Sequence, residues 1–427
     1  MKKLISVLIS LLFSATFLSA KTIEVTSGAD SGTGTLRQAI IDANDGDEIV
    51  FADNVTSITL SIGITIEKNI RITGNATSKT TISADTGLRP DDINYYFGHF
   101  FIPTNIKVSF NNLILTNGYN KTSCGGAILA YGSLTIDNCS FIKNRSKLGG
   151  AIYCSGSNAN LTVTNSIFQE NYSDGSAGAI GTSVNATLGN CSFIKNTCSY
   201  FSYGGAIENS GAGDLNINNC VFKENQSNKG SAIANAAKCV ITNSIFNKNK
   251  NHDNFGVIYN EGSLAVATLN VLNSTIANNG SIGLYVDDIT SETSLQNNIF
   301  WGNTANDIQV KNGNNGAITA SHNLIGASNT DLSGNGNLIG ENPLFVNAVN
   351  GDYSLQAGSP AINAGNNTYL SSEITGDLSG EPRIIGNTVD MGAYEFQSVT
   401  ASDKSISADT DKIPVAYYSV MGIKLQN

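Results

Sequence analysis

The chain has 427 residues, of which 41% are hydrophobic and only 14% charged, and its formal net charge is −10. It contains 55 Asn and 43 Gly but only 6 Pro. Few prolines and no Gly-x-y period exclude a collagen-like chain, and the hydrophobic fraction is sufficient for a large core. The acidic balance lacks the basic face that a nucleic-acid binder needs, so we expect no nucleic-acid partner.

The first 20 residues have the layout of a secretory signal peptide. Residues 1–3 include two lysines, residues 4–18 are mainly apolar, and Ser19 and Ala20 are small residues before Lys21. The apolar stretch is short for a bilayer span, and no other stretch reaches that length. The sequence therefore predicts export, no transmembrane span in the mature chain, and a location outside the cell or on the outer membrane surface.

Residues 34–44 predict a short helix, because Leu36, Ala39, Ile40 and Ala43 recur at helical spacing. The sequence then changes character. From residue 106 onward its apolar residues alternate with polar ones, as in β-strands, and internal repeats begin. The role of the helix follows from those repeats.

The repeats are marked by pairs of asparagines in the spacing Asn-x5-Asn. The eight pairs begin at Asn111, Asn138, Asn165, Asn190, Asn219, Asn243, Asn273 and Asn297. Between them lies a second marker, Gly-Gly-Ala-Ile, as at residues 125–128 and 149–152. A unit of about 24–30 residues with alternating apolar residues holds about three short strands and is too short for two packed helices.

Stacked units of this length predict an all-β parallel β-helix over residues 21–345, because no single unit could close a core by itself. A β-propeller is the alternative, but its blades need about 40 residues or more. The helix at residues 34–44 is interpreted as a cap over the open first coil. The first asparagine of each pair is predicted to form an amide ladder at a corner of the coil, and the glycines to form tight corners.

Several motifs resemble those of known bacterial families. Residues 34–40 and 47–51, followed by the Gly-Gly-Ala-Ile and Asn-Ser/Cys-x-Phe repeats, resemble right-handed parallel β-helix surface proteins described as polymorphic-outer-membrane-protein-like. Residues 342–345, 358–363, 377–383 and 390–395 resemble the choice-of-anchor β-helix domain. This resemblance implies right-handed coils and a closing module over residues 346–397, next to an interchangeable surface-attachment signal.

The end of the chain changes composition again. Residues 398–411 form a polar linker, and residues 412–427 resemble the start of the type IX sorting domain that Bacteroidetes-type bacteria use for export across the outer membrane. The later strands of that pattern are missing. The sequence therefore predicts a truncated sorting tail.

Neither metal nor redox chemistry is predicted from the sequence. The seven cysteines include no Cys-x-x-Cys, and Cys139, Cys191 and Cys220 follow a first-position asparagine, where a small inward side chain suits the core. Stacked free thiols are expected there, with a Cys191–Cys220 bridge as the alternative. We expect no cofactor. The charged residues of the C-terminal motifs, Asp377, Arg383, Asp390 and Glu395, are predicted to form ion pairs that hold turns, with a calcium site as the alternative.

A catalytic site is not evident either. Glycoside hydrolysis needs two carboxylates and lyase chemistry needs a positioned base, yet acids are sparse between residues 120 and 280 and the three histidines are scattered. We therefore assign no catalytic residue. A polysaccharide lyase or glycosidase stays as the alternative function, because many β-helix proteins cleave polysaccharides.

Two aromatic-rich inserts break the repeat and are the candidate binding residues. They supply Tyr95, Tyr96 and His99, and Tyr200, Phe201 and Tyr203. Such residues either complete the core or stack against sugar rings. The sequence therefore favours a monomeric adhesive or glycan-binding scaffold whose partner is an extracellular polysaccharide or a host or cell-surface glycoconjugate.

Overall fold

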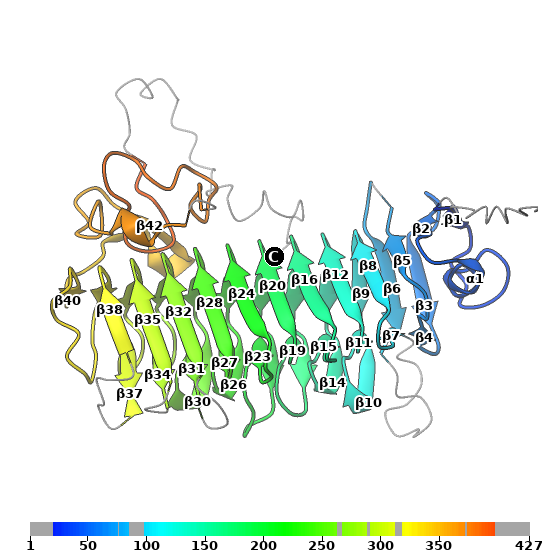
Figure 1. The fold of residues 1–427 in the computed structure, drawn as a ribbon, viewed down its shortest axis with the longest axis horizontal. Helices are drawn as coiled ribbons and strands as arrows, with labels where there is room; N and C mark the ends of the chain where they lie inside the picture. The colour runs from blue at the N-terminus through cyan, green and yellow to red at the C-terminus, as the bar shows by residue number, and fades with distance from the viewer. Residues whose placement is uncertain are drawn as a thin grey trace, which may run out of the picture.

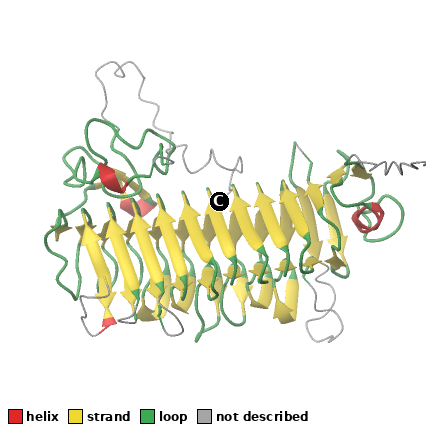
Figure 2. Cartoon of the chain, in the orientation of Figure 1, coloured by secondary structure: helices red, strands yellow, loops and turns green. Residues whose placement is uncertain are grey.

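The computed structural model describes residues 20–75, 77–84, 98–262, 267–287, 291–311, 318–371 and 374–397. These residues wind into an elongated parallel β-helix with very little α-helix, which confirms the predicted fold (Figures 1 and 2). The predicted linker at 398–411 and tail at 412–427 lie outside the described residues, as does the predicted signal peptide except Ala20.

Three parallel sheets of 12, 12 and 10 strands extend along the described helix, and a fourth sheet of 6 strands accompanies its middle coils. Sheet 1 contains β1 (Thr22–Val25), β2 (Glu48–Phe51), β5 (Ile70–Thr73), β8 (Lys107–Asn111), β12 (Ser133–Asp137), β16 (Asn160–Thr164), β20 (Asn185–Gly189), β24 (Asp214–Asn218), β28 (Lys238–Thr242), β32 (Thr268–Leu272), β35 (Glu292–Gln296) and β38 (Ile318–Ser321). Sheet 2 contains β3 (Ser57–Leu60), β6 (Thr80–Ala84), β9 (Leu113–Thr116), β13 (Ser140–Ile142), β17 (Ile167–Gln169), β21 (Ser192–Ile194), β25 (Val221–Lys223), β29 (Ile245–Asn247), β33 (Thr275–Ala277), β36 (Ile299–Trp301), β39 (Leu324–Ile325) and β40 (Leu338–Ile339).

The other two sheets consist of shorter strands. Sheet 3 contains β4 (Ile64–Thr65), β7 (Phe100–Ile102), β11 (Ile128–Ala130), β15 (Ile152–Cys154), β19 (Ile180–Thr182), β23 (Ile207–Asn209), β27 (Ile233–Asn235), β31 (Ile258–Asn260), β34 (Leu284–Val286) and β37 (Ile308–Val310). Sheet 4 contains β10 (Tyr119–Cys124), β14 (Arg145–Leu148), β18 (Tyr172–Ser173), β22 (Thr197–Cys198), β26 (Gln226–Lys229) and β30 (Lys250–Phe255). The middle coils therefore have four strands where three were expected.

The core consists of columns of inward side chains, in which equivalent positions of successive coils carry the same or a similar residue. The three-residue strands of sheet 2 from β13 to β29 point their middle residue inward, and all five of these residues are phenylalanines: Phe141, Phe168, Phe193, Phe222 and Phe246. Their rings stack with centroids 4.5–4.9 Å apart and planes within 7° of parallel. This spacing is that of hydrogen-bonded strands, so the backbone register sets the ring stacking.

A continuous amide ladder runs along the corner between sheets 2 and 4, and the second asparagine of seven of the eight pairs forms it. In the first pair Asn117 is not a member, and the amide of the next residue, Gly118, donates to Asn144 instead. The members of the ladder are Asn144, Asn171, Asn196, Asn225, Asn249, Asn279 and Asn303. Each Nδ2 donates to the Oδ1 of the next member at 2.7–3.0 Å, and Asn303 donates to Asp307. Asn196 makes four such bonds: Nδ2 to Asn225 and to the Phe168 carbonyl, and Oδ1 from the Asn171 amide and side chain.

The first asparagines, at which the ladder was predicted, lie instead in the turn between sheets 1 and 2. Seven of them have a positive φ, namely Asn138, Asn165, Asn190, Asn219, Asn243, Asn273 and Asn297. In the first pair, the residue with a positive φ is Asn112 and not Asn111. Side-chain bonds in this column are intermittent, as between Asn138 and Asn112 and between Asn190 and Asn165. These asparagines serve the left-handed turn that Asn tolerates, and the inward amide ladder lies six residues later.

Removing one interior ladder amide should destabilise the helix strongly. Asn196→Ala leaves the partners of four hydrogen bonds buried without a replacement, so we expect the free energy of unfolding to fall by about 3 kcal/mol. The exposed turn residue Asn190, changed to Gly, keeps its left-handed backbone and should cost less than about 1 kcal/mol. Denaturant unfolding followed by circular dichroism would contradict the ladder if the two losses were equal.

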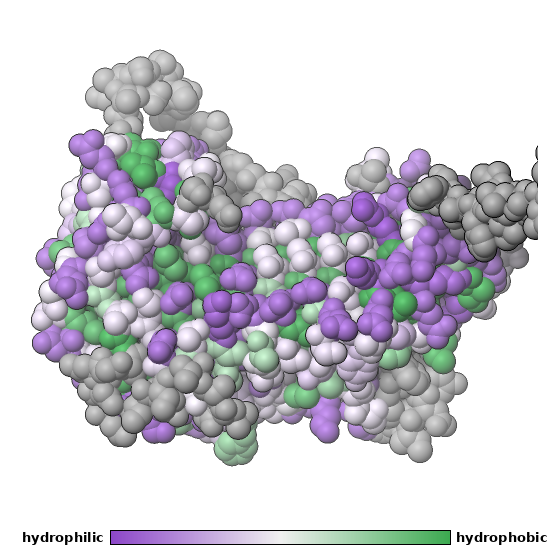
Figure 3. Space-filling model, viewed as in Figure 1, coloured by the Kyte–Doolittle hydropathy of each residue, from purple (hydrophilic) through white to green (hydrophobic). Residues whose placement is uncertain are grey.

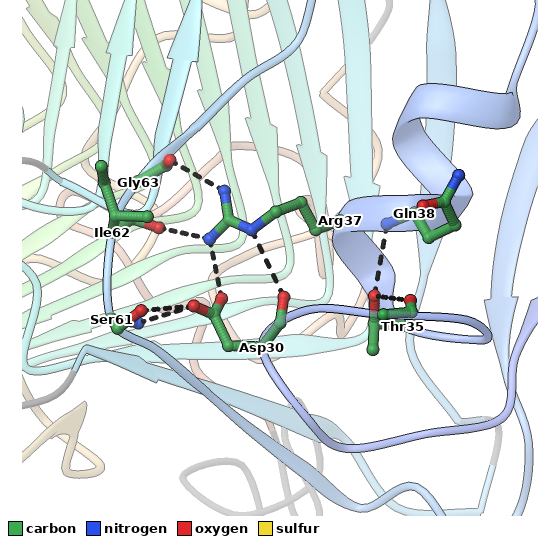
Figure 4. Close-up of polar contacts among 8 residues, drawn as sticks. Asp30, Thr35, Arg37, Gln38, Ser61, Ile62 and Gly63 are labelled. Atoms are coloured by element: carbon green, nitrogen blue, oxygen red, sulfur yellow. Dashed lines mark hydrogen bonds and ion pairs between the residues drawn. The ribbon is translucent and has the colours of Figure 1, made fainter.

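The predicted helix at the start of the chain is α1 (Leu36–Asp42), and it packs against β1 and β2 at the first coil (Figure 1). Leu36, Ala39 and Ile40 are buried, as the spacing indicated, and Thr35 caps the helix by accepting from the Gln38 amide. Figure 4 shows Arg37 binding Asp30 and the carbonyls of Ile62 and Gly63. These contacts tie the loop before α1 to the coil that it covers.

The described residues between 345 and 397, which include β42 in Figure 1, pack along the outward face of sheet 2 over its last coils. This C-terminal module contains the antiparallel pair β41 (Phe345–Asn347) and β42 (Asp352–Leu355), and the 3-10 helices η3 (Ala348–Asn350) and η4 (Asn367–Tyr369). Backbone bonds join it to the helix, including Gly392 N to the Asn297 carbonyl at 2.7 Å. The described part of the segment predicted as a closing module, residues 346–397, thus lies against the outward face of sheet 2.

The interior of this module is held by backbone amides that donate to three buried carboxyl groups. Asp377 accepts from three amides, and Asp390 and Glu395 from two each. Arg383, which is 1% exposed, donates to the carbonyls of Asp390 and Gly392. Burial raises the pKa of all three acids, that of Glu395 to about 7, and the Arg383 charge opposes this rise. These residues therefore hold turns, mainly through backbone hydrogen bonds.

Replacing the buried guanidinium should loosen the module while leaving the coils intact. Arg383→Met removes the positive charge amid three carboxyls, so we expect a loss of about 3–5 kcal/mol in module stability. The loss should be smaller at pH 5 than at pH 8, because Glu395 takes up a proton below about pH 7. Limited proteolysis between residues 345 and 397 measures the effect. The exposed cation Arg145, changed to Met, should leave the cleavage rate unchanged.

Candidate functional site

The sequence-predicted residues Tyr200, Phe201 and Tyr203 lie on the outer side of sheets 3 and 4, in the insert between β22 and β23. Other rings on the same side come from β15, β30, β31 and β34. We call this surface the aromatic flank and define it by Tyr153, Tyr200, Phe201, Tyr203, Phe255, Tyr259 and Tyr285.

Tyr200 and Phe201 form the exposed tip of the aromatic flank. Their rings are 48% and 82% exposed and meet edge to face with centroids 4.8 Å apart. The Tyr200 hydroxyl donates to Asp253 at 3.2 Å, and the His252 ring lies 4.7 Å from that of Tyr200. Because these contacts come from β30, two coils further along, the insert is held against the body of the helix.

Tyr203 belongs to a second group, in which three rings surround the ammonium of Lys229. Lys229 Nζ lies 5.0–5.2 Å from the ring centres of Tyr203, Phe255 and Tyr259, and it donates to the hydroxyls of Tyr203 and Tyr259 at 3.3 and 3.1 Å. Rings at this distance attract a cation, so the three rings and the ammonium of Lys229 hold one another in place.

The Tyr259 hydroxyl connects this group of rings to Asp287. Tyr259 donates to Asp287, which also pairs with Lys311 at 2.9 Å. Burial raises the pKa of Tyr259, and its bond to Asp287 raises it further. Burial opposes ionisation of Asp287 as well, but the bonds from Tyr259 and Lys311 outweigh it and lower the pKa of that carboxyl. The phenol is therefore neutral and the carboxylate charged.

Glu208 was not nominated from the sequence, yet it lies at the centre of the aromatic flank. Strand register places it on the outer side of β23, between Gly181 of β19 and Ala234 of β27. A Cβ at Gly181 would lie 2.8 Å from the Tyr153 ring, so that ring leans over the coil next to Glu208. Burial raises the pKa of Glu208 to about 7; Ser176 lowers it by hydrogen bonding and Glu261 adds to the rise.

The remaining nominated residues are not part of this surface. His99 is 1% exposed, its Nε2 lies 3.0 Å from the Thr116 carbonyl, and burial lowers its pKa to about 4. It is therefore a neutral residue of the core. Tyr95 and Tyr96 lie outside the described residues.

Sheet 1 offers a polar face, which Figure 3 shows from outside. A shallow groove of about 430 Å³ crosses its middle strands and is lined by Asn160, Thr162, Asn185, Thr187, Asp214 and Asn216. A second hollow, of about 410 Å³, lies where Tyr369 of the C-terminal module meets β35 and β38. Neither hollow gathers aromatic side chains as the flank does.

Metal-binding side chains do not gather in the described ranges, where no group of three or more His, Cys, Asp or Glu could hold an ion. The seven cysteines are free, and burial raises the pKa of Cys139 and Cys154 to about 12, so these thiols are protonated. No helix in the described part of the chain is long and apolar enough to cross a membrane.

Comparison with known proteins supports the fold. No protein family and no curated protein matches the sequence. Among solved structures, the crystal structure of the pectate lyase Pel9A is similar with a TM-score of 0.52 and 15% identity, over 88% of this chain and 96% of that one. A rhamnogalacturonan lyase is similar with a TM-score of 0.39 and 12% identity, over 71% and 87%. At this identity the likeness to Pel9A shows a shared parallel β-helix.

The raised pKa of Glu208 predicts a pH-dependent stability. Its folded pKa of about 7 lies above its ordinary value of 4.5, so the folded chain holds the proton more tightly and stability falls as pH rises from about 4.5 to about 7. Glu208→Gln removes this loss. We expect the free energy of unfolding of the variant, relative to that of the wild type, to be about 2 kcal/mol higher at pH 8 than at pH 5. Equal differences at the two pH values, measured by denaturant unfolding, would contradict the assignment.

Proposed function

We propose that this protein is an exported β-helix scaffold that binds glycans on the aromatic flank, displayed on the bacterial surface or released from it. The exposed pair Tyr200 and Phe201 carries the proposal, because an 82% exposed phenylalanine on a held insert loses free energy unless something covers it. Aromatic rings offer a flat apolar face with defined geometry, which the faces of sugar rings match.

The repeat geometry supports an extended ligand. Tyr153, Gly181, Glu208, Ala234, Tyr259 and Tyr285 follow one another in strand register. Neighbouring coils are about 4.8 Å apart, so this column is about 24 Å long. Tyr153 and Glu208 of this column are partly exposed and lie two coils apart, whereas the other four residues are buried. A ligand that meets both open side chains and the exposed tip must therefore be extended, which suits an oligosaccharide or polysaccharide better than a small molecule.

Adhesion and surface attachment extend the same proposal. The signal-peptide layout and the resemblance of residues 342–395 to a choice-of-anchor domain support export and attachment. An extracellular polysaccharide or a host or cell-surface glycoconjugate is the proposed partner, bound by a monomer without a cofactor. The lyase fold of Pel9A is consistent with a carbohydrate ligand, although a fold alone does not assign one.

Polysaccharide cleavage is the alternative, and Glu208 is the observation that favours it. A carboxyl that stays protonated near neutral pH can serve as a general acid toward a glycosidic oxygen. Incubating the protein with acidic and neutral polysaccharides, while following reducing ends and unsaturated products, tests this. Turnover that disappears in Glu208→Gln would establish the enzyme, and binding without turnover would reject it.

Truncating the exposed tip should weaken glycan binding without changing stability. For Phe201→Ala we expect retention on immobilised polysaccharide to fall several-fold, because one stacked ring contributes about 1 kcal/mol or more. Val349→Ala in the C-terminal module is the control, since Val349 is 81% exposed but lies outside the flank. Loss of retention in both variants, or in neither, would contradict the assigned surface.

A further inference from the structure

Glu208 is the one carboxyl in the outward column of sheet 3 within the described residues. Its neighbours in that column are Gly181 and Ala234, and the tyrosines Tyr153 and Tyr259 follow beyond them. The two small neighbours provide no side chain that reaches across the carboxyl. Glu208 is partly exposed, as is Tyr153, whereas Gly181, Ala234 and Tyr259 are buried, so a ligand would meet this column at Glu208 and Tyr153.

The carboxyl is also tied to the insert that carries the exposed rings. Ser176 hydrogen-bonds Glu208, and the Ser176 hydroxyl oxygen accepts from the Tyr203 amide at 3.2 Å. Tyr203 lies two residues after Phe201. A glycan stacked on the tip would therefore reach Glu208 within a few sugars.

We propose that Glu208 sets the charge class of the glycan that the aromatic flank binds: uncharged chains are accepted on both sides of neutral pH, and uronate-containing chains only while Glu208 is protonated. This inference rests on the proposed glycan binding. A protonated carboxyl has no net charge and can donate a hydrogen bond to a ligand oxygen, including that of a uronate. The ionised form repels a uronate across a short, partly desolvated distance.

The groups that face Glu208 do not take over this role. Tyr153 of β15 and Cys198 of β22 both have raised pKa values through burial, so both stay neutral around pH 7. Glu261, just after β31, interacts unfavourably with the ionised form of Glu208 and adds to the repulsion of an acidic ligand. Lys229, the cation of this region, is held by three rings and two hydroxyls.

Polygalacturonate and its methyl-esterified form are suitable probes, because they share one backbone and differ in charge. Titration calorimetry of the full chain at pH 5.5 and pH 8 measures both affinities. We expect the esterified polymer to bind alike at the two pH values and the acid polymer to lose about tenfold at pH 8. The loss should disappear in Glu208→Gln and persist in Glu341→Gln, which removes an exposed carboxyl between β40 and β41.

The outcomes separate this inference from the proposed function. If neither polymer binds at either pH, and a panel of neutral polysaccharides is not retained either, the glycan-binding proposal fails and this inference fails with it. If the polymers bind with the same pH dependence, or if Glu208→Gln keeps the tenfold loss, binding stands and the role of Glu208 is overturned. Glu208→Ala serves as a second variant should Glu208→Gln fold poorly, and circular dichroism checks each one.

Discussion

The whole structure depends on exact strand register, one coil directly above the last, and the amide ladder is the interaction that enforces it. Each interior asparagine fills two donors and two acceptors only if its neighbours occupy the same corner. A slip of one residue would leave buried amides unpaired and would turn the phenylalanine stack outward. Register is therefore specified by polar satisfaction as well as by apolar burial.

Because register is strict, the proposed binding surface lies where the columns change or the corners lengthen. The column of sheet 3 passes from Tyr153 through small residues to Glu208 and on to Tyr259. The insert between β22 and β23 adds Tyr200 and Phe201 beside it. Neither feature disturbs the core, since both point outward. A β-helix can thus carry a binding surface at little cost to its stability.

The sequence predicts the coils from the repeats, the N-terminal helix from its apolar spacing and the insert from the break in the repeat, but other features need three dimensions. Both asparagines of a pair recur with the same spacing, so the sequence does not say which one faces inward. The inward asparagine follows a residue with a left-handed backbone. Lys143 and Glu170 adopt this conformation, although neither is a glycine, so the sequence does not reveal it. Glu208 could be found by aligning the residues that follow each Gly-Gly-Ala-Ile. Lys229 could not, because its three rings come from the coils before and after its own.

Glu208 and Glu395 show why a raised pKa needs geometry before it indicates function. Burial is the main cause for both, and both reach a pKa of about 7. Glu395 is 4% exposed and accepts two backbone amides near Arg383, so its environment is already complete. Glu208 is partly open to solvent among aromatic rings, with Ser176 as its hydrogen-bond partner. Glu395 therefore stabilises the C-terminal module, whereas Glu208 is partly accessible to a ligand.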